Sequence, residues 1–218
     1  MKACVFIRPI TLSLALLAVA PQPSAAQEEG GLTGTVSADQ EWIDLSLAIT
    51  AFATDRDVVT AARGGPSLRL TNGAGIDVGG SFSPDGSKIV FESDRSGSQQ
   101  IYVMNADGSD QRRISFIAGR AATPEWSPRG DQIAFTHIAG SFRIAVMSPF
   151  GGEARHLTDA WQDEAPSWSP NGRVIQFFRT QANSGKTGIW QVDLTGRHER
   201  RLPTPVDASD PAWGPVLP

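Results

Sequence analysis

Residues 81–115 read SFSPDGSKIVFESDRSGSQQIYVMNADGSDQRRIS, and this stretch sets the pattern for most of the chain. Its opening turn, built on Pro84, recurs at Pro128 and Pro170, and a shorter echo lies at Pro215. The spacings are 44, 42 and 45 residues, from 84 to 128, from 128 to 170 and from 170 to 215. Repeats of this length that hold several short strands are typical of β-propeller blades.

Alternating apolar residues and turn residues divide the first unit into four short strands. We expect these strands at Phe82 and over 88–93, 101–104 and 111–115. Asp85-Gly86 and Asp107-Gly108 are pairs that favour tight turns between them. A single four-stranded sheet has two apolar faces, so copies must stack to bury them.

The repeat therefore predicts an all-β fold, a β-propeller of four-stranded blades that is incomplete or about four-bladed. The predicted blades span 78–118, 119–160 and 161–205, and a closing strand spans 210–214. Propellers close when a terminal strand completes a blade begun at the other end of the chain. Tryptophans recur at one repeat position, 126, 168 and 213, where we expect them to pack between blades.

The first 26 of the 218 residues have the features of a signal peptide. Lys2 and Arg8 precede an apolar run over 10–20, and small residues at 24–26 suit cleavage after Ala26. The run is short for a membrane anchor, which is the alternative reading. Cleavage removes Cys4, the single cysteine, and changes the formal charge from −4 to −6. An acidic chain without basic runs argues against nucleic acid as a partner, and after cleavage we expect no direct membrane insertion.

Residues 27–77 are ambiguous between a degenerate blade and a junction. Residues 68–71 match the outer strands of later repeats, and residues 57–61 suit a third strand. Residues 43–47 alternate like a second strand, but the turn before them lacks both Pro and Gly. A short helix around 46–54 is the other reading of this region.

A search for reactive groups finds no nucleophile elbow, phosphate-binding loop or dinucleotide fingerprint, so we predict no catalytic, cofactor-binding or metal-binding residues. The three histidines occupy different repeat positions, without the spacing of metal ligands. Recognition is expected in the loops that lead from each outer strand to the next inner strand, over 72–80, 116–123, 159–165 and 203–209. The best anchors there are Arg120, Thr123, Trp161, Asp163 and Glu164.

Residues 80–218 resemble the propeller of the TolB family of periplasmic Tol-Pal proteins. The resemblance rests on the quoted unit and on residues 199–218, ERRLPTPVDASDPAWGPVLP. It implies a periplasmic, non-enzymatic protein that binds the lipoprotein Pal and other Tol proteins and supports outer-membrane integrity during cell division. By position it places the Pal contacts just before the repeat prolines, at Ala122, Thr123, Glu164 and Ala165.

The family also has an α/β domain ahead of six blades, and this chain has room for neither. Its 192 residues after cleavage (218 − 26) hold at most about four and a half repeats. One alternative is therefore a truncated, non-functional fragment of such a protein. The other is a propeller associated with a peptidase or a carbohydrate-active enzyme.

Overall fold

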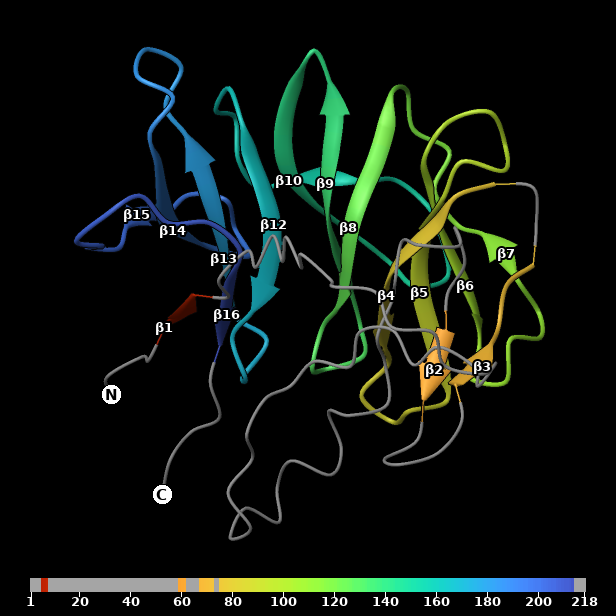
Figure 1. The fold of residues 1–218 in the computed structure, drawn as a ribbon. Helices are drawn as coiled ribbons and strands as arrows, with labels where there is room; N and C mark the ends of the chain where they lie inside the picture. The colour runs from red at the N-terminus through yellow and green to blue at the C-terminus, as the bar shows by residue number, and fades with distance from the viewer. Residues whose placement is uncertain (1–4, 8–58, 62–66, 73–74, 214–218) are drawn as a thin grey trace, which may run out of the picture.

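The computed structural model describes residues 5–7, 59–61, 67–72 and 75–213, and these form strands joined by turns and loops (Figure 1). Three antiparallel four-stranded sheets follow one another, and each keeps its strands in chain order. Blade 1 contains β4 (Asp77–Phe82), β5 (Lys88–Ser93), β6 (Gln100–Asn105) and β7 (Arg112–Arg113). Blade 2 contains β8 (Arg120–Trp126), β9 (Ile133–Ala139), β10 (Ser141–Met147) and β11 (Arg155–His156). Blade 3 contains β12 (Asp163–Trp168), β13 (Val174–Thr180), β14 (Thr187–Asp193) and β15 (Glu199–Arg201).

Figure 1 shows the three blades standing side by side, so the predicted all-β fold with incomplete propeller architecture is confirmed. The first strands of the blades, β4, β8 and β12, contact one another in succession, and β12 contacts β16 (Pro211–Trp213). We call these four the inner strands. Among the described residues no helix has the length and apolar character needed to cross a membrane.

Two shorter pairs involve the early part of the chain. β2 (Val59–Ala61) and β3 (Ser67–Arg69) form an antiparallel hairpin within the region predicted as a degenerate blade or junction. Most of that region, including 43–47, lies outside the described residues, so the assignment stays a prediction. β1 (Val5–Ile7) pairs with β16, although it belongs to the predicted signal peptide. The rest of that peptide also lies outside the described residues.

Apolar side chains between successive blades form the core. Val90, Ile101 and Val103 of blade 1 pack against Phe135 and Trp126 of blade 2. A second cluster joins blade 2 to blade 3 in the same way. Complete burial of a side chain of this size stabilises the fold by about 1.5–3 kcal/mol relative to exposure. The stacking of blades is therefore the main source of stability, as the repeat predicts.

The tryptophans link neighbouring inner strands. Trp126 exposes 7% of its surface and Trp168 4%, which confirms that both pack between blades. The Trp168 Nε1–H donates to the carbonyl of Glu125 at 3.0 Å, and the Trp213 Nε1–H donates to the carbonyl of Ser167 at 3.2 Å. Each bond runs from one inner strand to the preceding one.

Candidate functional site

Each inner strand of the three blades contains a β-bulge. The register with the next strand shifts between Val78 and Ser81, between Ala122 and Glu125, and between Glu164 and Ser167. The residue inside each bulge has a positive φ, and Asp210 occupies the same place before β16; these residues are Gly79 (69°), Thr123 (50°), Ala165 (52°) and Asp210 (49°). A positive φ at a residue other than glycine costs about 1–3 kcal/mol, and such residues cluster at functional sites.

The bulges change the expected position of the candidate residues. Six candidate residues that the sequence pattern places in loops lie in strands β8 and β12 of the structure. They are Arg120, Ala122, Thr123, Asp163, Glu164 and Ala165. The bulge interrupts the period-two alternation, and Pro124 and Pro166 follow it, so the sequence has the pattern of a loop. Within this set Arg120 and Thr123 are exposed, while Ala122, Glu164 and Ala165 are half-buried.

Side chains of the neighbouring blade hold two of the bulges. The Thr123 N–H donates to Oε2 of Glu92 in blade 1 at 2.6 Å. The Ala165 N–H donates to Oγ1 of Thr136 in blade 2 at 3.3 Å, and Thr136 also shares a hydrogen bond of 2.8 Å with the Thr123 hydroxyl. These contacts fix the backbone of the candidate residues and couple their position to the preceding blade.

Glu92 is the most perturbed acid of this region. It exposes 6% of its surface, and burial raises the pKa to about 7, while the Thr123 N–H and the Arg120 charge act to lower it. Gln99 connects the two charged groups, because its amide donates to Glu92 at 3.4 Å and accepts from Arg120 at 3.3 Å. Arg120 is therefore tied to the same network as the bulge at Thr123.

The bulges line an open cavity of about 580 Å³ where the four inner strands converge. Its walls are formed by residues Gly79, Gly80, Ser81, Phe82, Thr123, Pro124, Glu125, Ala165, Pro166, Ser167, Asp210, Pro211 and Ala212. The lining is mixed, with backbone, prolines and a few polar side chains, which suits contact with another polypeptide.

Asp163 differs from the other candidates because its side chain has no exposed surface. Its carboxylate accepts from Nε and Nη2 of Arg179 at 2.5 and 2.8 Å, and Arg179 also binds Glu199 at 2.8 Å. A buried group of this kind positions the start of β12 and has no surface of its own to offer a partner.

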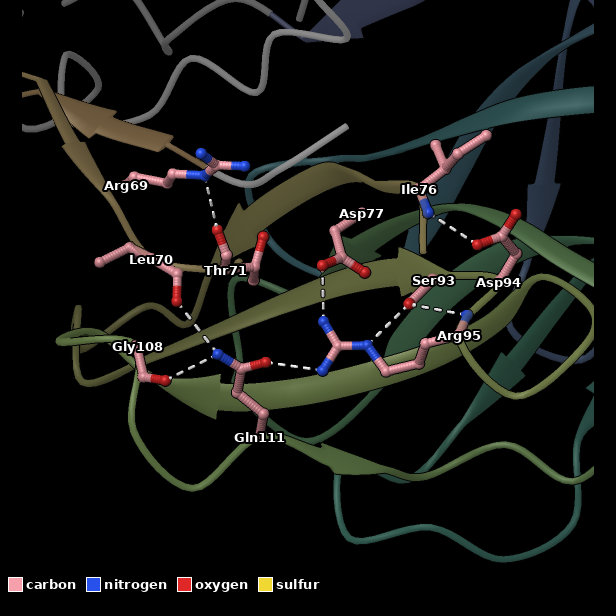
Figure 2. Close-up of polar contacts among 10 residues, drawn as sticks. All are labelled: Arg69, Leu70, Thr71, Ile76, Asp77, Ser93, Asp94, Arg95, Gly108 and Gln111. Atoms are coloured by element: carbon pink, nitrogen blue, oxygen red, sulfur yellow. Dashed lines mark hydrogen bonds and ion pairs between the residues drawn. The ribbon is translucent and has the colours of Figure 1, made fainter. Parts of the chain in front are cut away.

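Blade 1 repeats this arrangement at Asp77 (Figure 2). Arg95 donates to Asp77 at 2.6 Å and to Gln111 at 2.7 Å, and the Gln111 amide donates to the carbonyls of Leu70 and Gly108. The segment that precedes β4 is thus anchored to the outer edge of its own blade. This network could not be predicted from the sequence, because Arg95 is 18 residues from Asp77 and Gln111 is 41 residues from Leu70.

An exposed apolar side chain precedes every inner strand. We define the apolar rim as Ile76, Phe116, Trp161 and Val206, which expose 38, 75, 60 and 68% of their surface. Trp161 was among the predicted anchors, and the other three were missed. Their signal was present in the sequence, as large apolar residues within the connections that precede the inner strands. Exposed aromatic side chains of this kind are typical anchors of protein interfaces.

The histidines form a contact that the sequence did not indicate. Nδ1 of His137 and Nε2 of His156 are 2.6 Å apart, and burial and the neighbouring His137 lower the pKa of His156. Within the described ranges no three or more His, Cys, Asp or Glu side chains are arranged to hold a metal ion.

Comparisons with a family model and with curated proteins all point to TolB propellers. A family model described as the TolB beta propeller domain matches residues 45–217. The chain is 75% identical over 85 residues to Tol-Pal system protein TolB 1 of Novosphingobium aromaticivorans, which covers 39% of this chain and 19% of that protein. It is 68% identical over 84 residues to Tol-Pal system protein TolB of Zymomonas mobilis, which covers 38% of this chain and 18% of that protein.

A solved structure gives the same result for the fold. TolB from Acinetobacter baumannii matches with a TM-score of 0.65 and 28% identity, over 72% of this chain and 40% of that chain. The chain spans about a fifth of the length of the curated relatives it matches.

Proposed function

Because this chain belongs to the family of TolB beta propeller domains, we propose that it is a periplasmic, non-enzymatic component of a Tol-Pal system that binds another protein. The partner that we propose is the lipoprotein Pal, together with other Tol proteins, in support of outer-membrane integrity and cell division. The names of the curated relatives, which are Tol-Pal system proteins, support the system, and the partner is our inference.

The observation that carries this proposal is the apolar rim beside the bulged inner strands. Trp161 and Phe116 expose 60 and 75% of their surface on connections that lead into β12 and β8. Interfaces are dominated by a few such aromatic anchors, surrounded by polar contacts that exclude water. Arg120, Thr123 and Glu164 supply polar groups of this kind, while Ala122 and Ala165 supply small contacts beside them.

The bulges add rigidity to this surface. The Thr123 N–H is held by Glu92 at 2.6 Å and the Ala165 N–H by Thr136 at 3.3 Å, so the candidate residues are fixed before a partner arrives. A surface that is already ordered loses less conformational entropy on binding. Asp163, which is buried against Arg179, contributes by holding the start of β12.

Binding of purified Pal, measured by isothermal titration calorimetry, tests the proposal. We expect Trp161→Ala and Glu164→Arg each to weaken binding by about tenfold or more, as is usual for anchors and for a reversed charge at an interface. Glu153→Arg is the matched control, because Glu153 is an exposed carboxylate in the connection between β10 and β11.

Two results would remove the proposal. One is no measurable binding of Pal to the native chain, and the other is equal weakening of Pal binding by the control, by Trp161→Ala and by Glu164→Arg. Circular dichroism of each variant shows that the blades remain folded.

A further inference from the structure

Blade 2 departs from the other repeats at three positions near one end, and all three line the same cavity. The first is in the turn between its first two strands. Blade 1 has Asp85 in this turn, which accepts from the Ser83 hydroxyl at 2.6 Å and from the Ser87 N–H at 3.1 Å. Blade 3 has Asn171, which accepts from the Arg173 N–H at 3.0 Å. Blade 2 has Arg129, whose side chain has no acceptor and cannot close the turn in this way.

The second departure is in the hairpin between the last two strands. The residue before the positive-φ glycine is Asp107 in blade 1 and Thr195 in blade 3, and the side chains of both make hydrogen bonds within the turn. In blade 2 this residue is Phe150, which exposes 81% of its surface. A large exposed ring at a position that elsewhere stabilises the turn indicates a role in contact with a ligand.

The third departure is the indole of Trp126. Trp168 and Trp213 each donate Nε1–H to a carbonyl of the preceding inner strand. Nε1 of Trp126 is buried and has no hydrogen-bond partner among the described residues. A buried donor without an acceptor costs about 1–3 kcal/mol. Trp126 therefore lacks the acceptor that Trp168 and Trp213 each have.

These positions meet at a cavity of about 320 Å³ between blades 1 and 2. The cavity lies where the inner strands end, opposite the apolar rim where they begin. Its walls are formed by residues Ser83, Pro84, Asp85, Ser87, Lys88, Arg112, Trp126, Arg129, Gly130, Pro149 and Phe150.

Positive charge predominates in this cavity. Lys88 Nζ binds the neutral amide oxygen of Asn105 at 2.9 Å, and Nη2 of Arg112 binds the carbonyl of Pro149 at 3.4 Å. Arg129 is 54% exposed and pairs with Asp131 at 3.2 Å. Asp85 is the one acid in the wall, and hydrogen bonds from Ser83 and Ser87 occupy its oxygens and hold its pKa at about 2. An anion can therefore be accommodated on the arginine side of the cavity.

We propose that this cavity binds a carboxylate attached to a flat apolar group. The guanidinium groups of Arg112 and Arg129 are suited to bidentate binding of a carboxylate, and an acceptor oxygen would supply what Trp126 lacks. Pro84, Pro149 and Phe150 offer flat apolar surfaces on which a ring packs. Two sources have this chemistry, a free aromatic acid and the C-terminal aromatic residue of a peptide.

Isothermal titration calorimetry with phenylacetate and with the peptide acetyl-Ala-Ala-Phe tests the proposal. The amide forms of both compounds are the ligand controls, because they keep the ring and lose the charge. We expect the acids to bind at least about tenfold more tightly than the amides, since a charged hydrogen bond contributes about 1.5–3 kcal/mol. Tighter binding of the peptide than of phenylacetate assigns the site to a chain terminus, and the reverse assigns it to a free acid.

Variants taken from the sister blades keep the fold intact. Arg129→Asn and Phe150→Asp restore the turn residues of blades 3 and 1, and Trp126→Phe installs the ring that blade 1 has at Phe82. We expect each to weaken acid binding about tenfold, while circular dichroism shows that the blades remain folded. Arg155→Gln is the control, because Arg155 is exposed and pairs with β10 as Arg112 pairs with β6.

Three outcomes would overturn the proposal: equal affinity for acid and amide, equal weakening by Arg155→Gln, or no binding of either acid at millimolar concentration.

Discussion

Replacement of Glu92 by glutamine should stabilise the protein at neutral and alkaline pH and remove part of its pH dependence. Glu92 exposes 6% of its surface, and burial raises the pKa from 4.5 to about 7. A difference of this size between the folded and unfolded states corresponds to about 3 kcal/mol. The replacement must still offer an acceptor oxygen, because the Thr123 N–H donates to Oε2 of Glu92 at 2.6 Å.

The direction in which stability changes with pH follows from proton binding. Between about pH 4.5 and about pH 7 the folded state binds more protons at Glu92 than the unfolded state. The contribution of this group to stability is therefore complete below pH 4.5 and is lost as the pH rises through 7. Above that pH the buried charge destabilises the fold by up to about 3 kcal/mol. Glutamine avoids this charge, and its amide oxygen still accepts from Thr123.

Urea unfolding at about pH 5 and about pH 8 measures the effect. We expect Glu92→Gln to differ little from the native protein at the lower pH and to be about 1–3 kcal/mol more stable at the higher one. Glu153→Gln is the matched control at an exposed carboxylate. The lowered pKa of His156 changes stability with pH in the opposite direction, but it does so equally in the native protein and in the variant. The difference in unfolding free energy between the two proteins therefore reports on Glu92. An equal difference at both pH values, or a loss of stability at about pH 8, would show that burial does not raise the pKa of Glu92.

Three further predictions concern stability and are measured by thermal or urea unfolding. Asp163→Ala should lower the free energy of unfolding by about 3–5 kcal/mol, because it leaves Arg179 without its buried partner. Asp159→Ala, at an ion pair whose carboxylate is 86% exposed, should lower it by no more than about 1 kcal/mol. Equal losses would contradict the role of burial. Gly108→Ala should cost about 1 kcal/mol more stability than Gly97→Ala. Both glycines have a positive φ, but only at Gly108 would an added Cβ approach the Leu70 carbonyl oxygen, to 2.8 Å. Similar costs would argue against this contact. Trp168→Phe should cost about 1 kcal/mol more than Trp126→Phe, since only Trp168 loses a hydrogen bond; the reverse order would be inconsistent with the structure.

The sequence predicted the blades because their determinants are local. In each of the turns at Pro84, Pro128 and Pro170 the glycine N–H donates to the carbonyl of the serine before the proline, at 2.8 Å in all three. The run 88–93 forms β5, as its apolar pattern indicates. Period, turn chemistry and alternation act over a few residues, so a single sequence is enough to recognise them.

The candidate site was harder to predict because its determinants join distant residues. Glu92 and Thr123 are 31 positions apart, and nothing in either segment indicates their contact. Asp163 was selected as an exposed anchor, but its pairing with Arg179 depends on the sheet register. The bulges also hid the start of each inner strand, because a positive φ at Thr123 and Ala165 breaks the alternation on which strand prediction depends.

Hydrogen exchange of the amides, measured by mass spectrometry with and without Pal, tests most directly whether the start of the inner strands is the binding surface. We expect slower exchange on addition of Pal over residues 116–123 and 159–165, which contain Phe116, Thr123, Trp161 and Ala165. We expect no change over residues 148–151, at the opposite end of blade 2. Unchanged exchange in all three segments, or protection confined to 148–151, would show that Pal does not bind at the start of the inner strands.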